Sequence, residues 1–235
     1  TGHAVLQAKE LLAGEKGTLM VLCGDTPLLT PAALEKLAHE HEQQHAKATI
    51  LTAVFDDATG YGRIIRDADG SVMKIVEQKD ASEEEKKVLE ANAGIYCFDI
   101  EALFAALAKV TNDNAQGEYY LPDVIAILKN AGEKIWATAA DDAEDTLGIN
   151  SRFQLAGAEK ILRRRKCEEL MADGVTIMDP ATTYVDVDVK VGRDTVLYPM
   201  TWLEAGTEIG EGCEIGPSVR FQNVKCGDHV TGQFT

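Results

Sequence analysis

Large apolar side chains recur at every sixth position through one part of the chain, at Val185, Val191, Leu197, Leu203, Ile209, Ile215 and Phe221. Smaller residues recur at the same interval between them, at Val189, Thr195, Thr201, Thr207, Cys213 and Val219. An interval of six matches neither the period of a helix nor that of a flat strand. It is typical of hexapeptide β-helices, whose short strands wind into coils that stack apolar residues inward. Three such units make one coil of the left-handed form, so we predict the start of a left-handed β-helix of two to three coils over residues 174–235. An irregular β-rich tail would not keep this register.

The region before it alternates between helical and extended patterns. A short, wholly apolar run at 19–23 ends abruptly at Gly24, as in a strand that is covered on both faces. Helical spacing predicts helices over 3–13, 31–45, 82–89, 100–109 and 122–130, and extended runs predict strands over 49–54, 93–98 and 135–139. Residues 63–76 predict two short strands joined by a turn at Asp67–Gly70. Such alternation predicts an α/β layered domain with a mostly parallel sheet.

A basic stretch separates the two regions. Arg152 and the run Arg163–Lys166 lie along one predicted helix. Contact with nucleic acid is one explanation, but basic residues on an exposed helix are usually a solvated face. We therefore predict three segments: an α/β domain over 1–151, a linker helix over 152–173 and the β-helix start over 174–235.

The overall charge restricts the possible partners. The chain has 235 residues and a net charge of −16, so nucleic acid is not an expected partner, because phosphate binding relies on clustered Lys and Arg. A nucleotide substrate remains compatible, since a metal ion and a few lysines can neutralise its phosphates. No apolar run reaches membrane-spanning length, and no membrane association is expected. The 5 cysteines form no CxxC pair, which favours a reducing compartment, the cytoplasm.

Asp25 follows the apolar run, at the place where open α/β sheets bind ligands. Gly24 removes a side chain where a ligand could approach, and Pro27 prevents the strand from continuing. A carboxylate at this place could hold Mg²⁺, which takes few protein oxygens and the rest from substrate and water. An Asp-capped turn explains the same residues. The local pattern leaves both interpretations open.

Residues His41–His45 read H-E-x-x-H, the spacing at which two histidines of one helix bind zinc. A zinc site of this type is buried and needs a third ligand. Here Glu40, Ala46 and Lys47 flank the motif, and no later histidine occurs before His229. We interpret the motif as an exposed polar helix face.

Four further residues are weak candidates when each is taken alone. Gly62, in a Gly-Tyr-Gly-Arg turn, could let backbone N–H groups approach a ligand oxygen. Glu77 and Asn92 lie at predicted strand ends and could bind ligand groups, or they could be a solvated carboxylate and a local turn residue. Asn150 could supply a neutral oxygen ligand or belong to the N-cap region of the linker helix.

The order of several short motifs is more specific than any one of them. In chain order they are Thr-Gly-His-Ala at 1–4, Gly-Asp-Thr-Pro-Leu at 24–28, Thr-Gly-Tyr-Gly-Arg at 59–63, Ile-Val-Glu-Gln-Lys-Asp-Ala at 75–81, Asn-Ala-Gly-Ile-Tyr at 92–96, Asn-Ala-Gln-Gly-Glu-Tyr-Tyr-Leu at 114–121 and Gly-Ile-Asn at 148–150. The series resembles the bifunctional bacterial N-acetylglucosamine-1-phosphate uridyltransferase/glucosamine-1-phosphate acetyltransferase family. The resemblance covers essentially the whole chain, including the linker helix and the hexapeptide start.

The resemblance implies a Rossmann-like nucleotidyltransferase domain whose N-terminal part is missing. It also implies Mg²⁺-dependent attack of N-acetylglucosamine-1-phosphate on UTP, giving UDP-N-acetylglucosamine and pyrophosphate for cell-envelope precursors. Asp25 and Asn150 match the ligands of the catalytic Mg²⁺. The positions that match substrate contacts are Thr1 for uracil, Cys23, Gly24 and Asp25 for the nucleotide crevice, and Gly62, Glu77, Asn92 and Asn150 for the N-acetylglucosamine phosphate part. Because hexapeptide helices commonly trimerise, we expect a homotrimer for the full-length protein.

The chain departs from the family pattern at both ends and at one internal position. The Gly-rich N-terminal signature and the later coils that hold the acetyl-transfer site are absent, so we expect a fragment with little or no activity alone. Ala93 follows Asn92 where the family usually has Thr. Three alternatives remain: another sugar-1-phosphate nucleotidyltransferase that uses ATP, dTTP or GTP, a member that binds sugar nucleotides without turnover, and an acyltransferase alone, for which the chain lacks coils.

Overall fold

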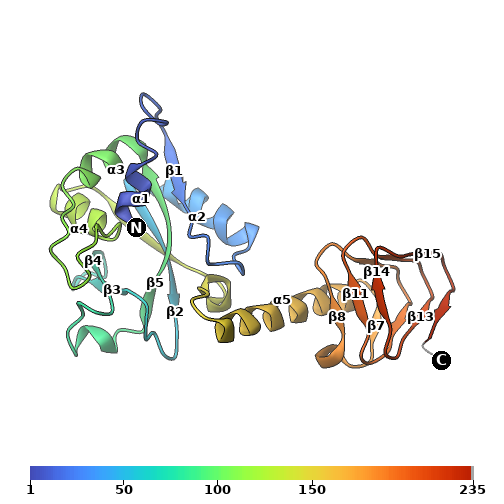
Figure 1. Ribbon diagram of the computed structural model, residues 1–235. Helices are drawn as coiled ribbons and strands as arrows, with labels where there is room; N and C mark the ends of the chain where they lie inside the picture. The colour runs from blue at the N-terminus through green and yellow to red at the C-terminus, as the bar shows by residue number, and fades with distance from the viewer. Residues whose placement is uncertain (234–235) are drawn as a thin grey trace. The chain divides into compact units, whose positions relative to one another are not determined.

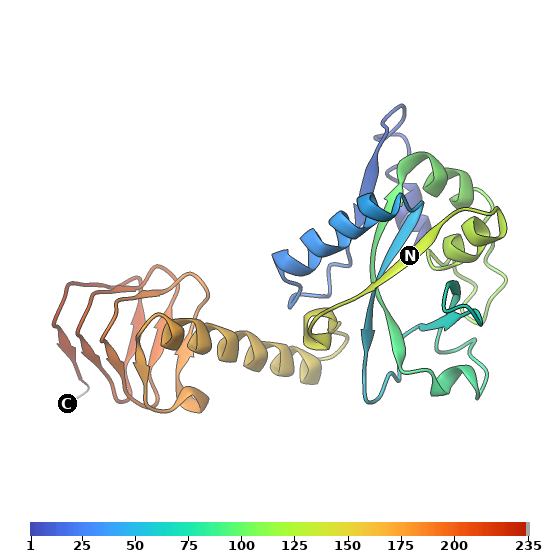
Figure 2. The ribbon, with the colours of Figure 1, turned by 180° about the vertical axis from the view of Figure 1, so that it is seen from behind.

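The computed structural model describes residues 1–233, and Phe234 and Thr235, the end of the predicted β-helix segment, lie outside the described residues. The chain divides into two compact units, of which the first is Thr1–Gly148 and the second begins at Ile149. The first unit is a sheet between helices, and the second is a long helix followed by a β-solenoid (Figure 1, Figure 2). These features confirm the predicted α/β domain followed by a helix and a β-solenoid.

A six-stranded sheet forms the centre of the first unit. Its strands are β1 (Thr18–Val21), β2 (Ala48–Val54), β3 (Arg63–Arg66), β4 (Val72–Val76), β5 (Glu90–Asp99) and β6 (Ile135–Ala139). Their order is β4-β3-β5-β2-β6, and β1 pairs with β5. Among the described strands of this sheet, only β2 and β6 pair in parallel, while β5 runs antiparallel to β1, β2 and β3.

The prediction of a mostly parallel sheet is therefore wrong. The run at 19–23 is also not covered on both faces as predicted, because β1 pairs only with β5 among the described strands, none of its residues is fully buried, and Leu22 is 48% exposed. The run carries no information about the direction of its neighbour. The predicted hairpin at 63–76 is confirmed, since β3 and β4 pair antiparallel around the turn at Asp67–Gly70.

Helices cover both faces of the sheet. α2 (Pro31–Gln44) lies on one face, and α3 (Ile100–Leu107) and α4 (Asp123–Asn130) lie on the other (Figure 1). α2 begins at a proline that follows Thr30, whose hydroxyl accepts a hydrogen bond from the Ala33 N–H at 3.3 Å. The two layers form separate apolar clusters, and the larger of them lies between the sheet and α3 and α4.

Two predicted helices are shorter in the structure. The segment predicted over 3–13 is helical only in α1 (Gly2–Leu6), and the segment over 82–89 contains a single 3-10 turn, η1 (Glu85–Lys87). Leu11 is 86% exposed, and Leu12 is the one residue of 7–13 that packs against the larger apolar cluster, so the second half of this segment has little apolar packing on the domain. Short helices without such packing are marginal in water.

The second unit starts with α5 (Arg152–Ala172), whose N-cap is Ser151. The basic stretch of this helix is only partly a solvated face. Lys166 is buried and bonds Glu169 at 2.8 Å, and the guanidinium of Arg163 lies 4.2 Å from the ring centroid of Tyr184. None of the helices in the described residues is long and apolar enough to cross a membrane.

After α5 the described part of the chain winds through ten short strands. They are β7 (Thr176–Ile177), β8 (Tyr184–Val185), β9 (Lys190–Val191), β10 (Val196–Leu197), β11 (Trp202–Glu204), β12 (Glu208–Ile209), β13 (Glu214–Ile215), β14 (Arg220–Gln222), β15 (Lys225–Cys226) and β16 (Thr231–Gly232). They form three parallel ladders, β7-β10-β13-β16, β8-β11-β14 and β9-β12-β15. The described strands therefore make three coils and the first strand of a fourth, consistent with the predicted left-handed β-helix.

The six-residue series forms the interior of these coils. Leu197 and Ile215 are each 0% exposed, and so is Thr201 from the series of smaller residues. The buried hydroxyl of Thr201 donates to the carbonyl oxygen of Tyr198 at 2.7 Å, so a polar side chain at this place keeps its hydrogen bond.

The period breaks at both ends of the solenoid. In the first coil the spacing from Ile177 to Val185 is two residues longer than the six-residue period, because the 3-10 turn η3 (Pro180–Thr182) lies between them. In the last coil Ile209 pairs with Cys226, one residue earlier than the period predicts. The sequence series therefore locates the middle of the solenoid more accurately than its ends.

Candidate functional site

A cavity of about 290 Å³ lies beside the ends of β1 and β4 and the middle of β5 in the first unit. Its lining residues are Thr1, Ala4, Val5, Val21, Leu22, Cys23, Glu77, Asn92, Gly94, Tyr96, Leu121 and Pro122. Four of the predicted substrate-binding residues are among them. Thr1, Cys23, Glu77 and Asn92 come from four separate segments of the chain, and the fold brings them to one cavity.

A bulge in β5 shapes one wall of this cavity. Along the ladder with β2, Ile50 faces Tyr96 and Thr52 faces Asn92, so a step of two residues on β2 corresponds to four on β5. Gly94 lies at the centre of this bulge with φ +75. A bulge shortens the strand and redirects its side chains, and here Asn92 and Tyr96 both line the cavity although four positions separate them.

Hydrogen bonds on both sides hold the bulge. The Gly94 N–H donates to Asn92 Oδ1 at 3.0 Å, and the Cys23 thiol donates to the carbonyl oxygen of Gly94 at 3.2 Å. A Cβ at position 94 would lie 3.1 Å from Cys23 Sγ, so the position requires glycine for its backbone conformation and for its lack of a side chain. Burial, together with the nearby Asp25, raises the pKa of the Cys23 thiol. The thiol therefore stays protonated and acts as a donor.

Glu77 supplies the acidic group of the cavity. Burial is the main cause that raises the pKa of Glu77, and the charges of Asp80 and Asp123 raise it further. The neighbouring Gly62 leaves room for this side chain, because a Cβ there would lie 3.3 Å from Glu77 Oε1. Gly62 does not line the cavity itself, but its carbonyl oxygen accepts a hydrogen bond from the Asn92 N–H at 2.8 Å. Gly62 thus connects the Glu77 and Asn92 sides of the cavity wall.

Thr1 lines the cavity beside α1, and its hydroxyl accepts a hydrogen bond from the Leu121 N–H at 3.1 Å. Gly24 and Asp25 lie in the turn after β1, outside the lining, and Asp25 is exposed. Asp25 makes no hydrogen bond or ion pair with any residue that the structure describes, so its carboxylate is available to a ligand.

Asn150 belongs to the second unit, directly before α5, where its N–H donates to Gln154 Oε1 at 2.7 Å. The convergence of Asp25 and Asn150 on one ion therefore stays a prediction. Their chemistry fits Mg²⁺, since a carboxylate and an amide supply only hard oxygen ligands.

The H-E-x-x-H segment lies at the end of α2, away from the residues that line this cavity. α2 ends at Gln44, and His45 adopts a left-handed conformation with φ 48, so the two histidines do not share regular helical geometry. His41 is buried, and its Nδ1 lies 2.8 Å from the Thr49 hydroxyl. These positions do not match the zinc pattern, and the burial of His41 also corrects the prediction of a wholly exposed face.

The structure adds site residues that sequence reasoning missed. Tyr96 and Gly94 line the cavity together with an apolar set, Ala4, Val5, Val21, Leu22, Leu121 and Pro122. The glycine had a usable signal, because an isolated glycine inside a strand pattern indicates a bulge. The apolar set had none, since such residues are indistinguishable from ordinary core in the sequence.

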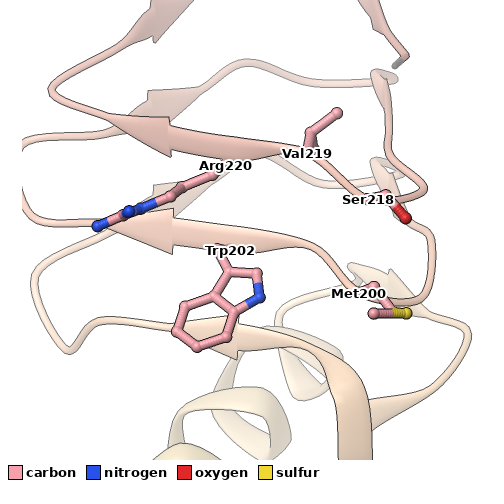
Figure 3. Close-up of a pocket in the computed structure, with 5 residues that line it drawn as sticks. All are labelled: Met200, Trp202, Ser218, Val219 and Arg220. Carbon is pink, nitrogen blue, oxygen red and sulfur yellow. The ribbon is translucent and has the colours of Figure 1, made fainter. Parts of the chain in front are cut away.

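A second hollow, of about 390 Å³, lies on the outer face of the solenoid at β11 and β14 (Figure 3). Trp202 and Arg220 project from these neighbouring strands. Trp202 stacks on Tyr184 with ring centroids 3.8 Å apart, and Arg220 donates to both carboxylate oxygens of Glu204. The charged group of this hollow is already paired, so it is the weaker candidate for a ligand site.

Comparison with known proteins assigns the family. The family model described as nucleotidyl transferase matches residues 1–206, which include the whole cavity. The chain belongs to the nucleotidyl transferase family.

Curated members of this family resemble the chain closely. The chain is 55% identical over 230 residues to the "Bifunctional protein GlmU" of Exiguobacterium sp., covering 98% of this chain and 51% of that protein. It is 54% identical over 228 residues to the protein of the same name from Halalkalibacterium halodurans, covering 97% of this chain and 50% of that protein. The chain thus spans about half the length of these relatives. A solved structure titled apo UDP-glucose pyrophosphorylase aligns with a TM-score of 0.45 and 18% identity over 59% of this chain and 51% of that one.

Proposed function

We propose that the protein transfers a uridylyl group from UTP to N-acetylglucosamine-1-phosphate, giving UDP-N-acetylglucosamine and pyrophosphate. The observation that carries the proposal is the gathering of Glu77, Asn92 and Cys23 at one cavity within the region that matches the nucleotidyl transferase family. The resemblance drawn from the motifs agrees with the names of the similar proteins.

The wall of the cavity supplies what binding of an amino sugar requires. Glu77 can only accept hydrogen bonds, whereas the Asn92 amide can both donate and accept, so together they match neighbouring sugar hydroxyl and acetamido groups. Apolar residues such as Val5 and Leu121 line the remainder. Ligand sites commonly combine a mostly apolar lining with a few placed polar groups.

In the proposed reaction an oxygen of the sugar 1-phosphate forms a bond to the α-phosphorus of UTP. The bond from that phosphorus to the bridging oxygen of the β-phosphate breaks, and pyrophosphate leaves. This chemistry depends on alignment and on charge neutralisation more than on a protein nucleophile. Glu77 and Asn92 serve it by holding the sugar so that its phosphate points at the nucleotide. The protonated Cys23 takes no part as a nucleophile and keeps the β5 bulge in place.

Asp25 and Asn150 would hold a Mg²⁺ ion, which when bound neutralises phosphate charge beside the reacting groups. Support for this assignment comes from the exposed carboxylate of Asp25, which has no partner among the described residues, and from the oxygen ligands that both side chains offer. For the complete protein we expect a homotrimer in the cytoplasm. Light scattering of the full-length protein measures its oligomeric state.

Pyrophosphate release from UTP and N-acetylglucosamine-1-phosphate by the full-length protein tests the function. Release should require the sugar phosphate and should be lost in Asp25→Asn. The matched control Asp113→Asn changes an exposed acid outside the cavity lining and should leave the rate unchanged. Faster release with ATP, dTTP or GTP would favour another sugar-1-phosphate nucleotidyltransferase, and binding of UDP-N-acetylglucosamine without any turnover would favour a non-catalytic binder.

A further inference from the structure

Tyr96 places a third polar group in the wall of the cavity. Its side chain is 2% exposed, and its ring stacks on that of Phe98 with centroids 5.3 Å apart. The ring is therefore fixed by packing. Tyr96 is nevertheless among the residues that line the cavity, and neither the motifs nor the proposed reaction gives it a role.

The β5 bulge brings Tyr96 next to the residues that are proposed to bind the sugar. In the ladder with β2, Tyr96 pairs with Ile50 and Asn92 pairs with Thr52. The side chains of Tyr96 and Asn92 are therefore about as far apart as those of neighbouring residues on one face of a regular strand. The Asn92 side chain and the Glu77 carboxylate both lie close enough to the Tyr96 hydroxyl to affect its pKa. A tyrosine hydroxyl can donate one hydrogen bond and accept another, so the Tyr96 hydroxyl has capacity for a ligand in the cavity.

The protonation state suits such a role. Burial raises the pKa of Tyr96 far above its ordinary value, and the nearby Glu77 and Cys23 add to this effect. The hydroxyl keeps its proton at any pH at which the protein works. It can therefore donate to a ligand oxygen, which Glu77 in its charged form cannot do.

We propose that the Tyr96 hydroxyl binds a hydroxyl of the sugar directly and so contributes to the choice of sugar. The inference rests on the proposed function and adds a specificity-determining residue to it. Glu77 accepts only, Asn92 donates and accepts, and Tyr96 donates from the same wall. Three groups with different hydrogen-bonding roles can distinguish the pattern of hydroxyls on one sugar from that on another, whereas an apolar wall cannot.

Tyr96→Phe is the sharpest test, because it removes the hydroxyl and keeps the ring that packs on Phe98. The affinity of the protein for UDP-N-acetylglucosamine, measured by isothermal titration calorimetry, should fall about three- to tenfold, as for the loss of one neutral hydrogen bond. The affinity for UDP should not change. The matched control is Tyr120→Phe, since Tyr120 is also buried but bonds Gln116 and Asp80 outside the cavity lining. This control should leave both affinities unchanged.

Ligands that lack single hydroxyls show whether the contact is direct. The 3-deoxy and 4-deoxy forms of the UDP-N-acetylglucosamine sugar, with the 6-deoxy form, are titrated against both proteins. For the form that lacks the hydroxyl bound by Tyr96, the substitution Tyr96→Phe should no longer matter, while the loss should persist for the other two.

The outcomes separate this inference from the proposed function. If the unchanged protein binds UDP-N-acetylglucosamine but Tyr96→Phe binds it equally well, the inference is wrong and the function stands. An equal loss for UDP, or the same loss for all three deoxy forms, also overturns the inference, because it indicates a general structural effect. If the unchanged protein binds no UDP-sugar, the proposed function fails and the inference fails with it.

Discussion

Substitution of Gly94 by alanine should damage both the fold and the sugar site. Gly94 has φ +75, and left-handed backbone costs an alanine about 1–2 kcal/mol relative to its usual conformation. The new Cβ would also lie 3.1 Å from Cys23 Sγ, so the thiol or the bulge must shift by a few tenths of an ångström. Together these effects should lower the free energy of unfolding by about 2–3 kcal/mol.

Urea unfolding measures this loss, and Gly70→Ala is the matched control. Gly70 has φ +83, but a Cβ at position 70 would have no other atom within 4 Å, so this variant carries the backbone cost without the contact. The control should lose about 1–2 kcal/mol. The excess loss in Gly94→Ala isolates the contact with Cys23, and adding Cys23→Ala to Gly94→Ala should remove most of that excess.

Ligand affinity provides the second half of the test. Asn92 Oδ1 accepts from the Gly94 N–H, so a displaced bulge displaces the Asn92 amide. The affinity for UDP-N-acetylglucosamine should fall about tenfold or more in Gly94→Ala, as for the loss of a hydrogen bond to the ligand, and stay unchanged in Gly70→Ala. Equal stability losses in the two variants, with unchanged binding in both, would refute the argument that the bulge positions the site.

Three further predictions follow from individual residues. Burial raises the pKa of Glu77, so on acidification the affinity for UDP-N-acetylglucosamine should decline at a pH above the pKa of an ordinary glutamate. Glu77→Gln should weaken binding about tenfold at neutral pH and flatten the dependence of affinity on pH. An unchanged pH dependence in this variant contradicts the argument. Burial lowers the pKa of His41, so the contribution of His41 to stability is complete above about pH 6.5 and is lost as the pH falls through its folded-state pKa. In urea unfolding, the stability of His41→Gln should depend less on acid pH than that of the unchanged protein, and the control His39→Gln on the same helix should not show this weaker dependence. Equal pH slopes of stability would oppose the argument. Leu203 is 1% exposed inside the solenoid, so Leu203→Ala should cost about 2–5 kcal/mol in chemical unfolding, and a loss below about 1 kcal/mol would show that the coils tolerate a cavity there.

The solenoid was the most predictable part of the fold. Each coil repeats one local rule, so the series from Val185 to Phe221 reports burial directly. Its ends were less predictable, because the turn at Pro180–Thr182 and the early pairing of Cys226 depend on how a particular corner closes. A period contains no information about such corners.

The sheet and the site needed different information. The apolar run that forms β1 predicted a strand correctly. It did not predict that β1 is partly exposed and pairs only with β5 among the described strands, or that this pairing is antiparallel, since both depend on connections elsewhere in the chain. Glu77 and Asn92 were identified through the order of motifs, and the structure adds that they share a cavity. Tyr96 was missed because a tyrosine in a buried strand resembles any core aromatic until the bulge at Gly94 is known.

A crystal structure of the protein with UDP-N-acetylglucosamine and Mg²⁺ tests the central claim most directly. The account predicts that the sugar occupies the cavity between Glu77 and Asn92, with the metal ion on Asp25. Electron density for the sugar nucleotide at any other place, with this cavity empty, would contradict it.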